Sequence, residues 1–93
     1  MLSVKEAVQA AEEWVHDLYP ESALKHLRLE EVQISDDEET WHITLGWAEP
    51  GVRENGLAAA LGRDAAVLPR IYKTVDVDAR SGGVRSMRIR EVG

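Results

Sequence analysis

The sequence predicts an α+β domain in which one N-terminal amphipathic helix packs on a four-stranded antiparallel sheet. Three patterns indicate this fold: apolar residues at helical spacing near the N-terminus, alternation in residues 41–47, and two alternating segments joined by a glycine-containing turn near the C-terminus. The 93 residues suit a single domain, 1–93. Its expected order is helix 4–19, hairpin 27–47, connecting segment 48–69 and hairpin 70–91.

The predicted helix begins after a capping box, because Ser3 is followed three residues later by Glu6. Apolar residues recur every three or four positions through 4–18 and fall in one arc, so this helix should lie on a sheet. Pro20 ends it. Trp14 is its largest apolar side chain, and we expect it to anchor the helix to the sheet.

The first predicted hairpin combines residues 27–35 with residues 41–47. In its second strand the residues expected to face the helix are Trp41, Ile43, Leu45 and Trp47. His42 falls on the opposite face, where an acid of a neighbouring strand can lie beside it. The apolar residues of the first strand change phase, which predicts either a β-bulge near Glu30 and Glu31 or one apolar pair facing away from the helix.

The closing hairpin consists of two strands joined by the polar turn 78–83. Its expected inward residues are Ile71, Val75, Val77, Met87 and Ile89. Either Gly82 or Gly83 can adopt a positive φ without steric cost, and the chain can therefore reverse there.

Residues 72–89, YKTVDVDARSGGVRSMRI, resemble the closing hairpin of PepSY-type domains, in which a strand ending in V-D-A precedes a T/S-G turn and a second strand. The leading helix and antiparallel sheet also match the small cystatin-like α+β architecture of that family. The resemblance implies a non-catalytic module that contacts or restrains a partner, sometimes a peptidase. Two features depart from the family pattern: segment 48–69, and an N-terminus without the export signal usual for exported or membrane-attached PepSY domains.

Composition and charge argue against several classes of function. The chain has no cysteine, which removes thiolate metal sites and cysteine nucleophiles, and no apolar run long enough to span a membrane. Residues 1–49 hold twelve acidic and three basic residues, a net charge of −9, whereas residues 50–93 carry +3. A net charge of −6 disfavours a nucleic-acid partner. We expect a cytoplasmic protein with no membrane partner.

The sequence shows no spacing that specifies a reaction or a metal site. His16, His26 and His42 lack the spacing of metal ligands. Segment 76–87 departs from a calcium loop at the positions that supply its ligands and its glycine. We therefore expect no catalytic residue, no cofactor and no bound metal.

Two hypotheses about function remain. The first is a non-catalytic protein-interaction module, such as an inhibitory, immunity or accessory subunit of a larger partner, binding through the exposed sheet face, the acidic turn 36–39 or segment 48–69. Its candidate contact residues are Asp36, Asp37, Glu38, Glu39, Arg53, Leu57 and Leu61. The alternative is a small-molecule-binding protein or small enzyme, with a helix–sheet cavity lined by Trp14, Trp41 and Trp47. A homodimer formed through an edge strand is a further option.

Overall fold

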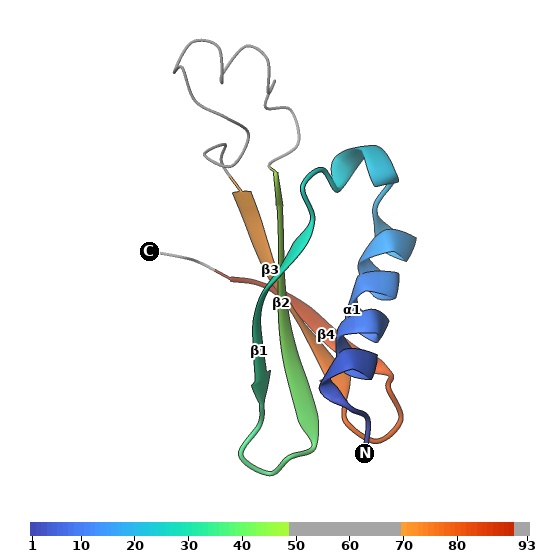
Figure 1. Ribbon diagram of the computed structural model, residues 1–93, viewed down its shortest axis with the longest axis vertical. Coiled ribbons are helices and arrows are strands. Elements are labelled where there is room, and N and C mark those ends of the chain that lie inside the picture. Colours follow the sequence, from blue (N-terminus) through green and yellow to red (C-terminus); the bar gives the residue numbers. More distant parts are fainter. Residues whose placement is uncertain (49–69, 91–93) are drawn as a thin grey trace.

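The computed structural model describes residues 1–48 and 70–90 and confirms the predicted fold class (Figure 1). Helix α1 (Val4–Leu18) packs on one face of an antiparallel sheet. The sheet order is β1-β2-β3-β4, which is also the order along the chain. The strands are β1 (Arg28–Ile34), β2 (Thr40–Ala48), β3 (Arg70–Asp78) and β4 (Val84–Ile89), and the short 3-10 helix η1 (Glu21–Ala23) lies between α1 and β1.

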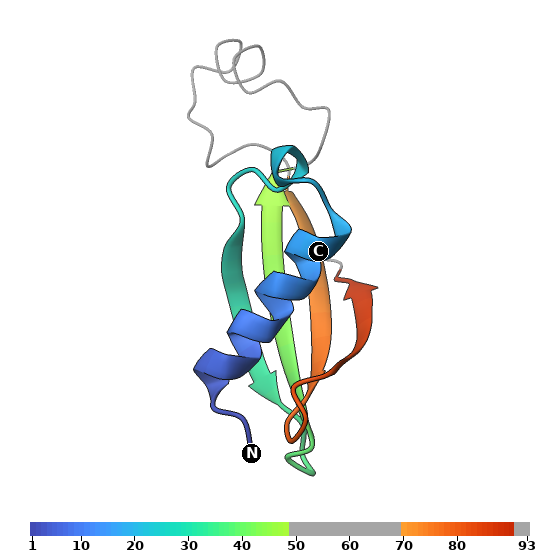
Figure 2. The same ribbon diagram turned by 90° about the vertical axis from the view of Figure 1, so that its right-hand side faces the viewer.

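The predicted capping box begins α1. The Ser3 hydroxyl accepts the Glu6 backbone N–H at 3.2 Å, and the Glu6 carboxylate accepts the Ser3 backbone N–H at 2.9 Å. The helix ends at Leu18, one residue earlier than predicted, and Tyr19 closes it by donating its N–H to the Val15 carbonyl. Figure 2 shows the helix running obliquely across the sheet.

The side chains that seat α1 on the sheet are small ones. Ala7, Ala11 and Val15 are fully buried, whereas Trp14 is 37% exposed. The prediction that Trp14 anchors the helix is therefore wrong. Alanines one turn apart let the helix lie close to the sheet, and this close approach leaves the large indole on the flank of the contact stripe.

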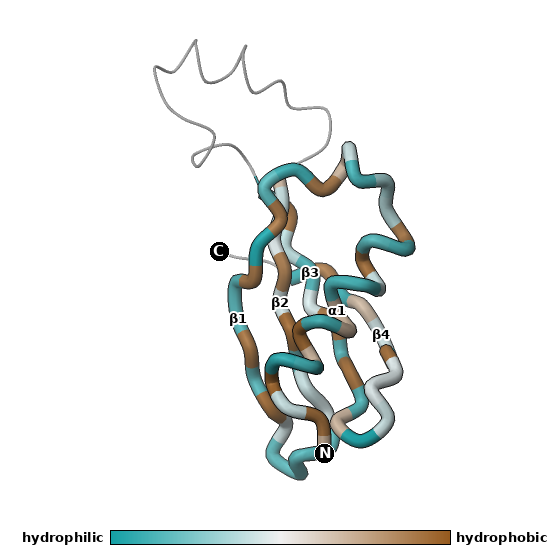
Figure 3. Tube along the Cα trace, turned by 45° about the vertical axis from the view of Figure 1, so that its right-hand side comes forward, coloured by the Kyte–Doolittle hydropathy of each residue, from teal (hydrophilic) through white to brown (hydrophobic). Residues whose placement is uncertain are grey.

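The core lies between α1 and the inner face of the sheet, defined as the face that α1 covers. Its largest fully buried side chains are Trp47, Ile43, Leu45, Val15, Val75 and Val77. Trp47 also packs against Tyr19, with ring centroids 5.4 Å apart. The alternation of hydrophobic and hydrophilic residues that produces this inner face is visible along β1 in Figure 3.

The predicted inward position of Ile89 is wrong, since this side chain is 73% exposed. Ile89 pairs with Lys73, two positions from the Met87–Val75 pair that packs at the core. Towards its C-terminal end β4 twists away from α1 (Figure 1). Alternation predicts on which face of the sheet Ile89 lies, but it does not show whether α1 covers that face at the end of β4, and here α1 does not.

Two irregularities fix how the strands align. The β1–β2 register shifts between Leu29 and Glu31, which confirms the predicted bulge. A second shift lies between Asp76 and Val77 in the β3–β4 pair. The central β2–β3 pair is regular from Thr40 opposite Asp78 to Ala48 opposite Arg70. Both register shifts therefore lie where an edge strand, β1 or β4, pairs with one of the two central strands, and the pairing of the central strands themselves is regular.

The predicted turn 78–83 is built on the side chain of Asp78. Its carboxylate accepts the backbone N–H groups of Ser81 at 2.9 Å and Arg80 at 2.8 Å, and it also pairs with Arg85. These two backbone hydrogen bonds, followed by the bond from Arg85, lower the pKa of Asp78 to about 2. Gly82 has the positive φ of 77° that the sequence predicted for one of the two glycines.

Candidate functional site

The acidic turn, residues 36–39, is exposed and connects β1 to β2. Asp37 gives it an internal order, since its carboxylate accepts the Ser35 hydroxyl at 2.5 Å and the Glu39 backbone N–H at 3.0 Å. These bonds, from Ser35 first, lower the pKa of Asp37. Asp36, Glu38 and Glu39 are exposed to solvent as well. The described part of the chain contains no group of His, Asp and Glu residues placed to hold a metal ion.

The other predicted contact residues, Arg53, Leu57 and Leu61, lie outside the described residues. The three tryptophans are not gathered around one space. Trp47 is 1% exposed in the core, Trp41 is partly buried and donates its indole N–H to the Leu2 carbonyl, and Trp14 lies on the helix flank. None of them lines either of the two hollows described next.

The larger hollow, here the α1–β1 groove, lies between one flank of α1 and Leu29 of β1 and has a volume of about 660 Å³. Its apolar residues are Val4, Val8 and Leu29, and both Val4 and Leu29 are 45% exposed. Its polar lining comes from α1 and consists of Lys5, Gln9, Glu12, Glu13 and His16. The groove adjoins β1, which pairs only with β2 among the described strands.

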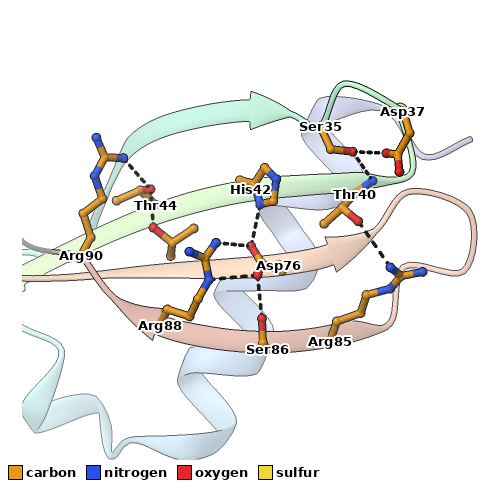
Figure 4. Close-up of polar contacts among 11 residues, drawn as sticks. Ser35, Asp37, Thr40, His42, Thr44, Asp76, Arg85, Ser86, Arg88 and Arg90 are labelled. Atoms are coloured by element: carbon orange, nitrogen blue, oxygen red, sulfur yellow. Dashed lines mark hydrogen bonds and ion pairs between the residues drawn. The ribbon is translucent and has the colours of Figure 1, made fainter.

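The second candidate surface is the outer face of the sheet, opposite α1, where a polar network centres on Asp76 (Figure 4). Its carboxylate is bonded to the Nδ1 atom of His42 at 2.6 Å and accepts the Ser86 hydroxyl at 2.6 Å. Arg88 donates to both carboxylate oxygens, through Nε at 3.1 Å and Nη2 at 2.9 Å. Side chains of three adjacent strands therefore converge on one carboxylate.

The register of the sheet produces this convergence. His42 lies directly opposite Asp76 in the β2–β3 pair, as expected from its position on the outer face. Asp76 lies opposite Ser86 in the β3–β4 pair, immediately before the register shift. The sequence pointed to an acid beside His42 and to acids paired with the arginines of the last strand, but it did not identify Asp76 as the acid shared by His42 and Arg88, or Ser86 as its third partner. The polar residues of the alternating segments, His42 in the second strand, Asp76 in the third, and Ser86 and Arg88 in the fourth, are all expected on the outer face, and this shared phase could have identified the cluster.

Asp76 is ionised in the folded protein. Burial raises the pKa of its carboxyl, but the hydrogen bonds from Arg88, Ser86 and His42 and the charge of Arg88 outweigh burial and lower the pKa to about 2. The same pairing raises the pKa of Arg88. Because an ionised carboxylate only accepts hydrogen bonds, His42 must carry a proton on Nδ1.

The arrangement differs from that of a serine nucleophile with a histidine base. In such a site the histidine lies between the serine and the acid. Here Asp76 lies between Ser86 and His42, and the Ser86 hydroxyl donates to the carboxylate. A carboxylate with a pKa of about 2 is a weak base, so Ser86 is not activated as a nucleophile.

Next to this network lies a smaller hollow of about 320 Å³, here the outer-face hollow. Its floor contains Thr44 and Thr74, which are 3% and 6% exposed and whose hydroxyl oxygens lie 2.9 Å apart. Arg90 donates to Thr44 at 3.5 Å and pairs with Glu31. The complete lining is Glu31, Gln33, His42, Thr44, Thr74, Arg88 and Arg90.

The chain matches no family model, no curated protein and no solved structure. The helix on a four-stranded antiparallel sheet is consistent with the cystatin-like architecture that the PepSY resemblance implies. In the described ranges, no helix combines the length and the hydropathy that crossing a membrane requires.

Proposed function

We propose that this protein is a non-catalytic interaction module that binds an extended segment of a larger partner in the α1–β1 groove. The observation that carries this proposal is the position of exposed apolar side chains beside an edge strand. Leu29 belongs to the inner face of the sheet, since it pairs with Leu45 of the core. α1 leaves it 45% exposed.

A strand added to the edge of β1 would extend the sheet beneath the flank of α1. Its backbone would pair with β1, and alternate side chains would enter the groove and contact Val4, Val8 and Leu29. The bulge next to Leu29 interrupts the ladder, so we expect the added strand to pair with residues 31–34, where the register with β2 is regular.

Charge indicates the composition of the bound segment. Glu12 and Glu13 line the groove, and the acidic turn 36–39 follows the end of β1. Lys5 is the basic residue in the lining. We therefore infer a partner segment with apolar side chains at alternate positions and lysine or arginine beside them.

The resemblance of residues 72–89 to the closing hairpin of PepSY-type domains supports the same class of function. That family implies a module that contacts or restrains a partner, sometimes a peptidase. An inhibitory, immunity or accessory subunit is the role that we infer for this chain.

The test uses a randomised library of displayed peptides, selected on the wild-type protein, with fluorescence anisotropy for the affinities of the selected peptides. We expect alternating apolar and basic sequences whose affinity falls about tenfold or more on Leu29→Asp, since an apolar side chain that the bound peptide would cover is replaced by a charge. The matched control is Ile89→Asp, which places the same charge at an exposed apolar residue of the other edge strand.

Two results would contradict the proposal. The first is that the library yields no sequence preference, or yields peptides that bind Leu29→Asp as well as wild type. The second is a wild-type dimer in sedimentation that Leu29→Asp abolishes and Ile89→Asp does not, because a second copy would then occupy the groove.

A further inference from the structure

We propose that the outer-face hollow binds a small ligand through a carboxylate or phosphate group, with Arg88, Arg90 and the paired hydroxyls of Thr44 and Thr74 as hydrogen-bond donors. This site lies on the face of the sheet opposite α1 and is independent of the α1–β1 groove. Its volume of about 320 Å³ suits a ligand at the small end of those that protein pockets bind.

The arginines retain donors that the protein itself does not use. The Nε and Nη2 atoms of Arg88 donate to Asp76, and its Nη1 makes no hydrogen bond to a described residue. The Nη1 atom of Arg90 donates to Glu31 and Thr44, and its Nε and Nη2 make no hydrogen bond to a described residue. Asp76 and Glu31 thus hold two guanidinium groups in place beside one hollow, which reduces the entropy lost when a ligand binds.

The floor of the hollow supplies a donor of a different kind. Because a guanidinium can only donate, Thr44 accepts from Arg90, and either threonine can donate its hydroxyl proton to the other. In both arrangements one of the two hydroxyl protons has no acceptor among the described residues. A free hydroxyl proton on a pair of residues that are 3% and 6% exposed favours a ligand oxygen above the pair.

Both arginines of the lining are paired with a carboxylate, Arg88 with the ionised Asp76 and Arg90 with Glu31. They therefore attract an anion through their unused N–H donors rather than through a net positive charge. The carboxylate of Asp76 holds the Nδ1 proton of His42, and the Nε2 atom of a neutral imidazole can accept a hydrogen bond from a ligand hydroxyl. Planar guanidinium groups match carboxylate and phosphate oxygens in geometry as well as in charge.

The proposal is tested by NMR titration of the full chain with inorganic phosphate and, separately, with acetate, both at constant ionic strength set by chloride. We expect saturating shifts of the amide signals at hollow residues with at least one of the two anions. Phosphate alone would indicate a phosphate group in the natural ligand, and acetate alone a carboxylate.

Variants separate this site from general attraction of anions. Arg90→Gln should raise the dissociation constant about tenfold, because it removes a charge-assisted hydrogen bond. Arg85→Gln is the matched control, since it removes the same charge from β4 at a residue that pairs with Asp78 outside the hollow. Thr74→Val should weaken binding and Thr74→Ser should restore it, with thermal melting used to verify that each variant folds.

Two outcomes would overturn the proposal. One is the absence of saturating shifts with both phosphate and acetate at millimolar concentrations. The other is an equal loss of affinity in Arg85→Gln and Arg90→Gln, which would mean that anions respond to the charge of β4 as a whole.

Discussion

Replacing Asp76 with asparagine removes the charge at the centre of the outer-face network while preserving the size of the side chain. In the folded protein this carboxyl has a pKa of about 2, against an ordinary value of 3.8. Such a difference corresponds to about 2 kcal/mol in the free energy of unfolding. The side chain of Asp76 is 13% exposed, so solvent screens these contacts weakly. We expect Asp76→Asn to lower the free energy of unfolding by about 2 kcal/mol at neutral pH.

The stabilisation that Asp76 contributes should depend on pH, and its direction follows from the lowered pKa of this carboxyl. The folded pKa of Asp76 lies below the unfolded one, so the ionised carboxylate contributes its full stabilisation above about pH 4, near the unfolded pKa. That contribution is lost as the pH falls towards about 2, where the folded carboxyl also takes up a proton. The difference in stability between wild type and Asp76→Asn should therefore shrink across this interval.

Urea unfolding, followed by tryptophan fluorescence at a series of pH values, measures both effects. Asp36→Asn is the matched control, because Asp36 is exposed in the acidic turn and its replacement should change stability by less than about 0.5 kcal/mol. The reasoning is refuted if Asp76→Asn is as stable as wild type at neutral pH. A loss of stability that stays constant from neutral to acidic pH would refute it equally.

Two further pairs of substitutions test the fold. Trp47→Ala should lower the free energy of unfolding by about 3–5 kcal/mol, because its side chain is 1% exposed, whereas Trp14→Ala should cost about 1 kcal/mol or less; urea unfolding compares them. Gly82→Ala should reduce stability by about 1–2 kcal/mol in thermal melts, since Gly82 has a positive φ and an added Cβ would approach Leu2 to 3.1 Å. Gly83→Ala is the control and should cost less, because no positive φ is found at Gly83. Equal losses in the two variants would contradict the conclusion that Gly82 is the glycine that the turn requires.

Local patterns were sufficient to predict the fold. The capping box at Ser3, the alternation in β2 and the change of phase near Glu30 are each read within a few residues, and each acts through local geometry. The turn 78–83 was predictable for the same reason, since Asp78 and Gly82 act on the backbone beside them. Helix, strands, bulge and turn could therefore be assigned without knowledge of their tertiary contacts.

Features that depend on how elements meet were not predictable in this way. An amphipathic arc contains Trp14, but the arc does not show how wide a stripe the sheet covers. The convergence of His42, Arg88 and Ser86 on Asp76 depends on the register of three strands and on a shift in the last pair. The acidic turn could be located from sequence, whereas the α1–β1 groove depends on where the helix crosses the sheet.

The regular β2–β3 pair at the centre of the sheet has a consequence for folding kinetics. Each outer pair joins strands that are close in sequence, but Ala48 and Arg70 are paired across the whole of segment 48–69. The sheet is therefore completed only when β2 and β3 meet, the two paired strands with the longest connection between them, and the entropy of closing that loop enters the folding barrier. Doubling the length of the segment would add about 0.6 kcal/mol to this cost, which would slow folding about threefold if the pair forms in the transition state.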